Sequence, residues 1–163
     1  MKTIRLSLQA MACIACLTIL SCGFYSFTGN TLPPHIRTVS IPLFENGTSE
    51  FGIDQQLTDG IIQAVIRDNT LKIARAREGD SVLKGRITRV EDRAGQYDQS
   101  ESVSDYRIYL SVSVSFEDVR KQQVLWEETF SQFGTYSGDR DEGIQEAVEK
   151  LTADIVTKTV SGW

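Results

Sequence analysis

The stretch YRIYLSVSVSFE, residues 106–117, alternates apolar with polar side chains over its whole length. The apolar side chains recur at every second position: Tyr106, Ile108, Leu110, Val112, Val114 and Phe116. Successive side chains of a strand point to opposite faces, so this pattern predicts a strand with one buried face. The other face is mainly a row of serines, which fits either a flat docking surface or a face covered by water.

Two further strands flank this one in the sequence. Residues 124–133 follow a turn at 118–123, and they predict a hairpin with the central strand. Residues 82–90 place Leu83, Gly85 and Ile87 on one face and predict another strand. A long polar loop is expected between them, from residue 91 to residue 105.

The segment IRTVSIPLF, residues 36–44, predicts a fourth strand with Val39, Ile41 and Leu43 on one face. Pro42 lacks a backbone N–H group, so the strand ends there or lies at an edge of the sheet. Residues 71–73 are expected to be a short extended piece.

Apolar side chains at helical spacing predict two helices. The first has its stripe at Ile53, Leu57, Ile61 and Val65, and the second, over residues 141–159, at Ile144, Val148, Leu151 and Ile155. Thr48 or Ser49 is the expected N-cap of the first helix, and Asn69 its left-handed end. Ser137 or Asp139 is the expected cap of the second.

The resulting order is β-α-β-β-β-α. A helix between the first two strands suggests a parallel crossover, and the later strands are expected to pair antiparallel. We therefore predict an α+β sandwich, with two helices packed on one face of a four-stranded mixed sheet. Residues 36–163 are expected to form this single domain.

The first residues carry an export signal. Lys2 and Arg5 precede an apolar run over residues 6–20, and Ser21 is a small residue at the expected cleavage point. Because Cys22 follows that point, the segment resembles a bacterial lipoprotein signal, with lipid on Cys22. We thus expect residues 1–21 to be removed and residues 22–35 to form a lipidated tether.

Two other interpretations of this segment remain open. It could stay as an uncleaved anchor, although the fifteen-residue run is shorter than the roughly 20 residues that span a membrane. Cys16 could carry the lipid instead, but Cys13 rather than an aliphatic residue stands three positions before it.

The charge balance limits the classes of partner. The chain has 17 basic and 22 acidic residues. Removal of residues 1–21 takes away Lys2 and Arg5, which leaves 15 basic residues and a net charge of −7. An acidic chain is poorly suited to bind nucleic acid or an anionic membrane surface. Membrane contact is therefore expected through the lipid alone.

The sequence lacks the residues of a recognisable catalytic site. His35 is the only histidine, so a zinc cluster or a Cys–His pair cannot be assembled. Asp139, Asp141 and Glu142 cluster, but acidic residues also stabilise the start of a helix, and we prefer that interpretation. We predict no enzyme activity, no metal site and no cofactor.

CGFYSF at residues 22–27 and six later segments resemble the LPS-assembly lipoproteins of the LptE type, in the order expected for that family. The six segments are LPPHIRTVSIPLFEN (32–46), LTDGIIQAVIRDNTLKI (57–73), LKGRITRVED (83–92), FEDV (116–119), VLWEETF (124–130) and EAVEKLTADIVTKTVSGW (146–163). The resemblance implies an outer-membrane lipoprotein, lipid-anchored and facing the periplasm. It also implies that the protein plugs and supports a β-barrel partner, an LptD-like LPS-assembly protein, and assists delivery of lipopolysaccharide to the outer leaflet.

Two points of function stay open beside that resemblance. A periplasmic lipoprotein that docks on and regulates a cell-wall synthesis enzyme is the alternative. Arg93 and Arg140, with Tyr97 and Tyr136 nearby, are expected at one end of the sheet, where arginine could bind lipid A phosphates. The same loops also carry aspartates, so these arginines could instead be solvated charges with local partners.

Overall fold

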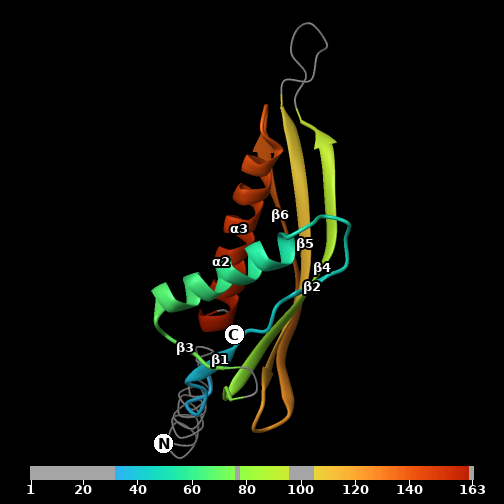
Figure 1. Cartoon of the computed structure of the whole chain (residues 1–163). Helices are drawn as coiled ribbons and strands as arrows, with labels where there is room; N and C mark the ends of the chain where they lie inside the picture. Colours follow the sequence, from blue (N-terminus) through green and yellow to red (C-terminus); the bar gives the residue numbers. More distant parts are fainter. Residues whose placement is uncertain (1–31, 76–77, 96–104, 162–163) are drawn as a thin grey trace, which may run out of the picture.

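The computed structural model describes residues 32–75, 78–95 and 105–161 (Figure 1). The proposed signal peptide, Cys22 and Tyr97 lie outside these residues. The elements, in chain order, are β1 (Thr38–Ser40), β2 (Glu45–Asn46), α2 (Ile53–Asp68), β3 (Lys72–Ile73), β4 (Ser81–Ala94), β5 (Tyr106–Asp118), β6 (Gln123–Tyr136) and α3 (Arg140–Ser161).

The strands form one mixed sheet in the order β3-β1-β4-β5-β6, with β2 also paired to β4. The short strands β1, β2 and β3 are parallel to their neighbours, whereas β4, β5 and β6 form a long antiparallel meander. Helices α2 and α3 lie on the same side of this meander (Figure 1). The α+β architecture, the parallel crossover and the hairpin are confirmed.

The predicted number of strands is wrong, because the sheet has six strands rather than four. The expected strand at residues 36–44 is shortened to β1. The two additional strands are β3, in the expected extended piece, and β2, which follows the expected strand. Strands β1 and β2 both pair with β4. Pro42 has no donor for a sheet ladder, and it lies in the gap between the two strands. Phe44 is consequently buried, whereas Leu43, expected inside, has 60% of its surface exposed.

The long strands also extend further than the sequence indicates. Strand β4 continues to Ala94, four residues into the expected polar loop, because β5 supplies pairing partners as far as Tyr106. This extension brings Asp92 and Arg93 into the sheet. We call the end where Ala94, Tyr106 and Tyr136 pair the tip, and the opposite end the base.

A β-bulge interrupts β4 at Thr88. Ile87 pairs with Val112 and Arg89 with Ser111, so Thr88 is an extra residue without a partner of its own. One extra residue exchanges the two faces of a strand. Arg89 and Arg93 therefore lie on the same face as Lys84 and Arg86.

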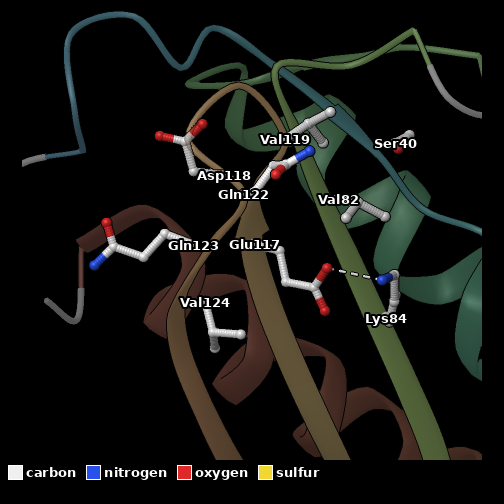
Figure 2. Close-up of a pocket in the computed structure, with 9 residues that line it drawn as sticks. All are labelled: Ser40, Val82, Lys84, Glu117, Asp118, Val119, Gln122, Gln123 and Val124. Carbon is white, nitrogen blue, oxygen red and sulfur yellow. Dashed lines mark hydrogen bonds and ion pairs between the residues drawn. The ribbon is translucent and has the colours of Figure 1, made fainter.

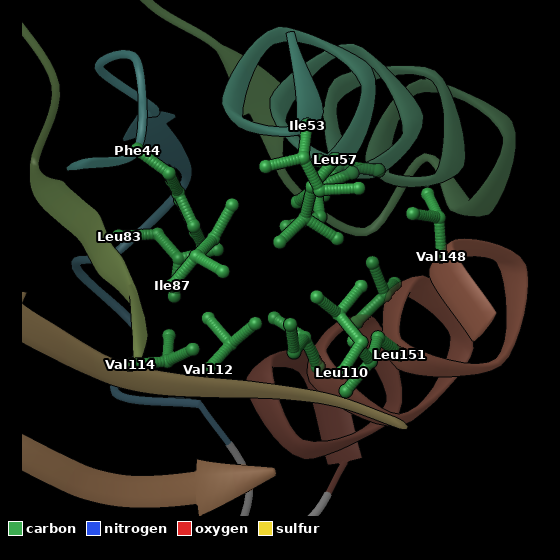
Figure 3. Close-up of a cluster of buried hydrophobic side chains, with 14 of the residues drawn as sticks. Phe44, Ile53, Leu57, Leu83, Ile87, Leu110, Val112, Val114, Val148 and Leu151 are labelled. Atoms are coloured by element: carbon green, nitrogen blue, oxygen red, sulfur yellow. The ribbon is translucent and has the colours of Figure 1, made fainter. Parts of the chain in front are cut away.

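The core lies between the sheet and the two helices (Figure 3). Leu57 and Ile61 of α2, Leu151 of α3 and Val112 of β5 are completely buried. Burial of each such side chain contributes about 1.5–3 kcal/mol to folding. This core confirms the predicted apolar stripes of both helices and of the central strand, except at Tyr106, which is 41% exposed.

The helix ends agree with the sequence in all but one case. Asn69 ends α2 in the left-handed conformation, with φ 61°, and its N–H donates to the carbonyl of Val65. Asp139 caps α3 by accepting the N–H of Asp141 at 3.0 Å. The expected Thr48 or Ser49 cap of α2 is wrong, because Gly52 precedes the helix with φ 77° and no side chain caps it.

Candidate functional site

The candidate site is the face of the meander opposite the helices, which we call the open face. Strand pairing assigns these residues to it: Val82, Lys84, Arg86, Arg89, Glu91 and Arg93 from β4; Arg107, Tyr109, Ser111, Ser113, Ser115 and Glu117 from β5; and Glu127, Thr129, Ser131, Phe133 and Thr135 from β6. Both described helices pack on the other face (Figure 1). The predicted row of serines occupies the middle of the open face.

A column of basic side chains runs along β4 on this face. Lys84 lies 2.7 Å from Glu117 and Arg86 lies 3.5 Å from Glu45. Arg89 has no acidic side chain within salt-bridge distance in the described part of the chain. The open face is thus richer in positive charge than the acidic composition of the chain suggests.

Arginines and aromatic rings alternate at the tip of the open face. The Arg93 guanidinium lies 4.8 Å from the centre of the Tyr109 ring, and the Arg107 guanidinium lies 5.2 Å from that of Phe133. The two rings are 5.6 Å apart. Cation–π contacts of this kind orient a guanidinium while some of its N–H groups stay available.

Arg107 has an unusual polar environment. Its Nε atom is buried and has no hydrogen-bond partner among the described residues. A buried donor without an acceptor is costly, so an anionic oxygen bound here would supply the missing partner. We call Arg93, Arg107, Tyr109 and Phe133 the tip cluster.

Arg93 is already paired within its own strand. Its Nε and Nη2 atoms donate to the two carboxylate oxygens of Glu91 at 3.1 and 3.0 Å. These hydrogen bonds raise the pKa of Arg93 and lower the pKa of Glu91. Both side chains are well exposed, so a ligand phosphate can compete with Glu91 for this guanidinium.

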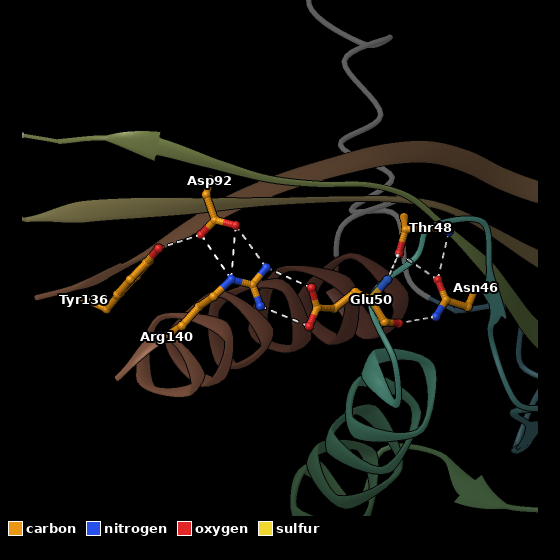
Figure 4. A network of polar contacts seen from close by, with 6 residues as sticks. All are labelled: Asn46, Thr48, Glu50, Asp92, Tyr136 and Arg140. Carbon is orange, nitrogen blue, oxygen red and sulfur yellow. Dashed lines mark hydrogen bonds and ion pairs between the residues drawn. The ribbon is translucent and has the colours of Figure 1, made fainter. Parts of the chain in front are cut away.

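Arg140, on the helix side of the tip, is enclosed by carboxylates (Figure 4). It donates two hydrogen bonds to Glu50, at 3.0 and 2.8 Å, and three to Asp92, between 3.0 and 3.3 Å. The hydroxyl of Tyr136 also donates to Asp92, at 2.8 Å. Arg140 thereby joins α3, β4 and the turn before α2.

These contacts shift the pKa values of the cluster. Hydrogen bonds to Glu50 and then to Asp92 raise the pKa of Arg140. Burial alone would raise the pKa of Asp92, but hydrogen bonds from Arg140 and Tyr136 lower it below its ordinary value. The hydrogen bond to Asp92 is the main cause that raises the pKa of Tyr136. At neutral pH, Arg140 and Asp92 are therefore charged and Tyr136 is neutral.

The structure brings the two sequence-predicted arginines to the same end of the sheet but places them in different environments. Arg93 belongs to the open face, whereas Arg140 lies at the start of α3 and all its named contacts are internal. Binding of lipopolysaccharide by either residue stays a prediction. The sequence analysis missed Arg107, since an isolated arginine in an alternating strand gives no signal of its aromatic neighbour.

A shallow pocket of about 520 Å³ marks the base of the open face (Figure 2). Val82, Val119 and Val124 provide apolar walls around the Lys84–Glu117 ion pair. Within the described part of the chain, no group of three His, Cys, Asp or Glu side chains is arranged to hold a metal ion. No described helix has the length and apolar character needed to cross a membrane.

Polar contacts also hold His35, near the N-terminal end of the described chain, at the base of the sheet. His35 Nε2 lies 2.6 Å from the completely buried carboxylate of Asp118. Burial alone would raise the pKa of Asp118, but the N–H of Lys121 and the imidazole of His35 hold it below its usual range. The end of the proposed tether is therefore fixed at the base, opposite the tip cluster.

A comparison with protein families gives one match that spans most of the chain. Residues 36–159 match the model of the lipopolysaccharide-assembly family LptE. The matched range includes every described strand and nearly all of α3. No curated protein matches the sequence.

Solved structures share the fold at low sequence identity. The PelC dodecamer from Paraburkholderia phytofirmans superposes with a TM-score of 0.61 at 16% identity, over 82% of this chain and 95% of that chain. Protein XCC0632 from Xanthomonas campestris gives a TM-score of 0.60 at 15% identity, over 80% and 90%. The hypothetical protein CT253 from Chlamydia trachomatis gives 0.60 at 11% identity, over 76% and 95%. These likenesses concern the fold alone.

Proposed function

The chain belongs to the LptE family of lipopolysaccharide-assembly proteins, and from this membership we propose its specific task. It is an outer-membrane lipoprotein that plugs a β-barrel translocon, supports the assembly of that barrel and assists delivery of lipopolysaccharide to the outer leaflet. The observation that carries the proposal is the family match over residues 36–159. The task requires binding and scaffolding, and the proposal assigns the protein no catalytic step.

Two features of the chain support this role. The N-terminal sequence has the arrangement of a lipoprotein signal, with Cys22 as the proposed lipid attachment site. The folded part offers a long sheet whose open face carries serines, basic residues and the tip cluster. A long sheet with one face free of the described helices suits a protein that fits inside or against a larger partner.

We further propose that the tip of the sheet contacts lipopolysaccharide. Arg93 contributes directly, because its exposed guanidinium can exchange Glu91 for a phosphate. Arg107 adds a buried N–H that lacks an acceptor, and Tyr109 and Phe133 offer apolar surface to acyl chains. Arg140 acts as a positioning residue, because it holds Asp92, the residue that precedes Arg93 in β4.

Co-purification tests the main proposal. The full chain, expressed in a bacterium that lipidates it, is extracted with detergent and its stable partner identified. A stoichiometric outer-membrane β-barrel is the expected result. Recovery of a peptidoglycan synthase in place of a barrel would reject the proposal in favour of the cell-wall regulator.

Binding of purified lipopolysaccharide tests the contact at the tip. The Arg93→Ala/Arg140→Ala variant is expected to bind at least tenfold more weakly, since each charge-assisted hydrogen bond contributes about 1.5–3 kcal/mol. Arg107→Ala should weaken binding further. Arg67→Ala, a charge removal at the far end of α2, is the matched control. Parent-like binding by a folded double variant would reject this contact.

A further inference from the structure

Phe51 is the most exposed large apolar side chain of the described residues. All of its surface is accessible, and Leu43 nearby in the chain is 60% exposed. Neither residue belongs to the open face, because both lie in the segment before α2 and line a groove with residues of that helix. Burial of a phenylalanine is worth about 1.5–3 kcal/mol, so its complete exposure leaves that energy available to a partner.

The turn that displays Phe51 is rigidly constructed (Figure 4). The Asn46 side chain accepts the N–H of Thr48 at 2.9 Å and donates to the carbonyl of Glu50 at 2.6 Å. The N–H of Glu50 donates to the Thr48 hydroxyl at 3.2 Å. The carboxylate of Glu50 is then held by Arg140. Phe51 thus follows a residue whose backbone and side chain are both fixed.

The backbone is fixed on the other side of Phe51 as well. Gly52 has φ 77°, a left-handed conformation that glycine adopts without strain, and α2 begins at the next residue. A side chain displayed between two fixed points loses little backbone entropy when a partner covers it. Preorganised aromatic residues of this kind are typical anchors of protein interfaces.

Phe51 and Leu43 border a groove of about 610 Å³ between the turn and the first half of α2. Ile41 and Ile62 add apolar lining, and Asp54 and Asp59 add two carboxylates. In the described part of the chain, neither carboxylate has a basic side chain within salt-bridge distance. The groove is therefore apolar with a negative rim.

This combination selects among the possible occupants. An anionic membrane surface would be repelled by Asp54 and Asp59, whereas a polypeptide with basic side chains around an apolar one would match the groove. We propose that Phe51, Leu43 and this groove form a docking site for a protein partner that inserts an apolar side chain flanked by lysine or arginine. The inference rests on the proposed function in taking the β-barrel as that partner.

Affinity measurement with the co-purified barrel tests the docking site. Phe51→Ser is expected to raise the dissociation constant at least tenfold and to leave thermal unfolding unchanged, because the Phe51 side chain is fully exposed. Ile73→Ser is the matched control, since Ile73 is 37% exposed but lies on β3, outside both the groove and the open face. Equal affinities of parent and Phe51→Ser would overturn the inference.

Charge reversal tests the acidic rim separately. Asp59→Lys should weaken the complex by several-fold and reduce its sensitivity to salt, because one attractive charge becomes repulsive. Glu149→Lys makes the same charge change on α3, outside the groove, and should bind like the parent. An Asp59→Lys variant that binds more tightly would contradict a basic partner.

The remaining outcomes separate this inference from the proposed function. If the parent recovers the barrel but Phe51→Ser binds it equally well, the docking site is wrong and the proposed function stands. If the parent recovers no barrel, both fail. Phe51-dependent binding to phosphatidylglycerol vesicles, or Phe51-dependent dimers in sedimentation, would overturn the inference in favour of a lipid surface or a second copy.

Discussion

The contact between Gly85 and Phe44 shows how one residue permits the core to close. A Cβ atom built on Gly85 would lie 2.1 Å from Cε2 of the Phe44 ring, which is itself buried. We predict that Gly85→Ala destabilises the fold by about 1–3 kcal/mol, the usual cost of overpacking. Urea unfolding measures this difference.

Gly138→Ala provides the control for that substitution. No atom lies within 4 Å of a Cβ built on Gly138, so its free energy of unfolding should stay close to that of the parent. If both alanine variants unfold at the same urea concentration as the parent, Phe44 does not hold the position that the structure gives it.

Gly85 and Phe44 also show where sequence patterns become ambiguous. Alternation assigned Leu43 to the core together with Val39 and Ile41. Chain geometry at Pro42 changes that phase, so Phe44 enters the core in place of Leu43. Alternation of apolar and polar residues predicts burial only where strand pairing is continuous, and pairing is interrupted between β1 and β2.

Asp92, in the Arg140 network at the tip, makes the stability of the fold depend on pH in a predictable way. Its pKa is lowered from 3.8 in the folded state, so its contribution to stability is full above that value and is lost as the pH falls through the folded pKa. Asp92→Asn should therefore be less stable than the parent at pH 7 by about 1 kcal/mol, because the pair with Arg140 is partly exposed.

The difference in stability between the parent and Asp92→Asn should disappear in strong acid, where Asp92 is protonated. Thermal unfolding at a series of pH values measures it. Asp59→Asn makes the same change at an exposed acid without a described ion pair and is the matched control. A constant gap between parent and Asp92→Asn down to acid pH would show that the substitution acts by packing rather than by charge.

At the scale of elements, the bulge at Thr88 determines which face of β4 is basic. Deletion of Thr88 would shift every later residue of β4 by one position and turn Arg89 and Arg93 toward the helices. Burial of two charges is far more costly than the net stability of a small domain, so we predict that this deletion prevents folding. Circular dichroism and gel filtration report the outcome.

Thr88→Ala keeps the bulge and serves as the matched control. It removes one hydrogen bond, from the Thr88 hydroxyl to the Ser111 carbonyl at 3.2 Å, and should cost about 1 kcal/mol or less. A deletion variant as stable as Thr88→Ala would mean that β4 slips to another register without penalty.

The sequence predicts elements well where a single period continues over many residues. Strand β5 and both helices satisfy this condition, and the expected ends of all three lie within four residues of the observed ones. Strands β2 and β3 have two residues each, too few for any period to be visible. The tip cluster depends on cross-strand register, which the bulge at Thr88 sets and which no local pattern encodes.

At the scale of the whole molecule, the described core is independent of the proposed lipid attachment site. The residues that form the core begin at Ile36. We predict that Cys22→Ala folds normally but leaves the membrane fraction and recovers the barrel partner poorly. Fractionation and co-purification test this expectation.

Cys16→Ala is the matched control for that variant. It changes a cysteine of the segment that we expect to be removed, so it should behave like the parent. Full barrel recovery with Cys22→Ala in the soluble fraction would show that the lipid contributes nothing beyond location.

The pairing of His35 with Asp118 has a consequence for local concentration. It fixes the point where the proposed tether begins, so the meander behaves as a rod about 40 Å long that is attached at its base. Residues 22–35, if fully extended, would add a reach of at most about 50 Å. One molecule confined to a hemisphere of that combined radius has a local concentration on the order of 1 mM. A dissociation constant of about 100 µM would then be enough to keep the binding site of a partner within reach about nine-tenths occupied.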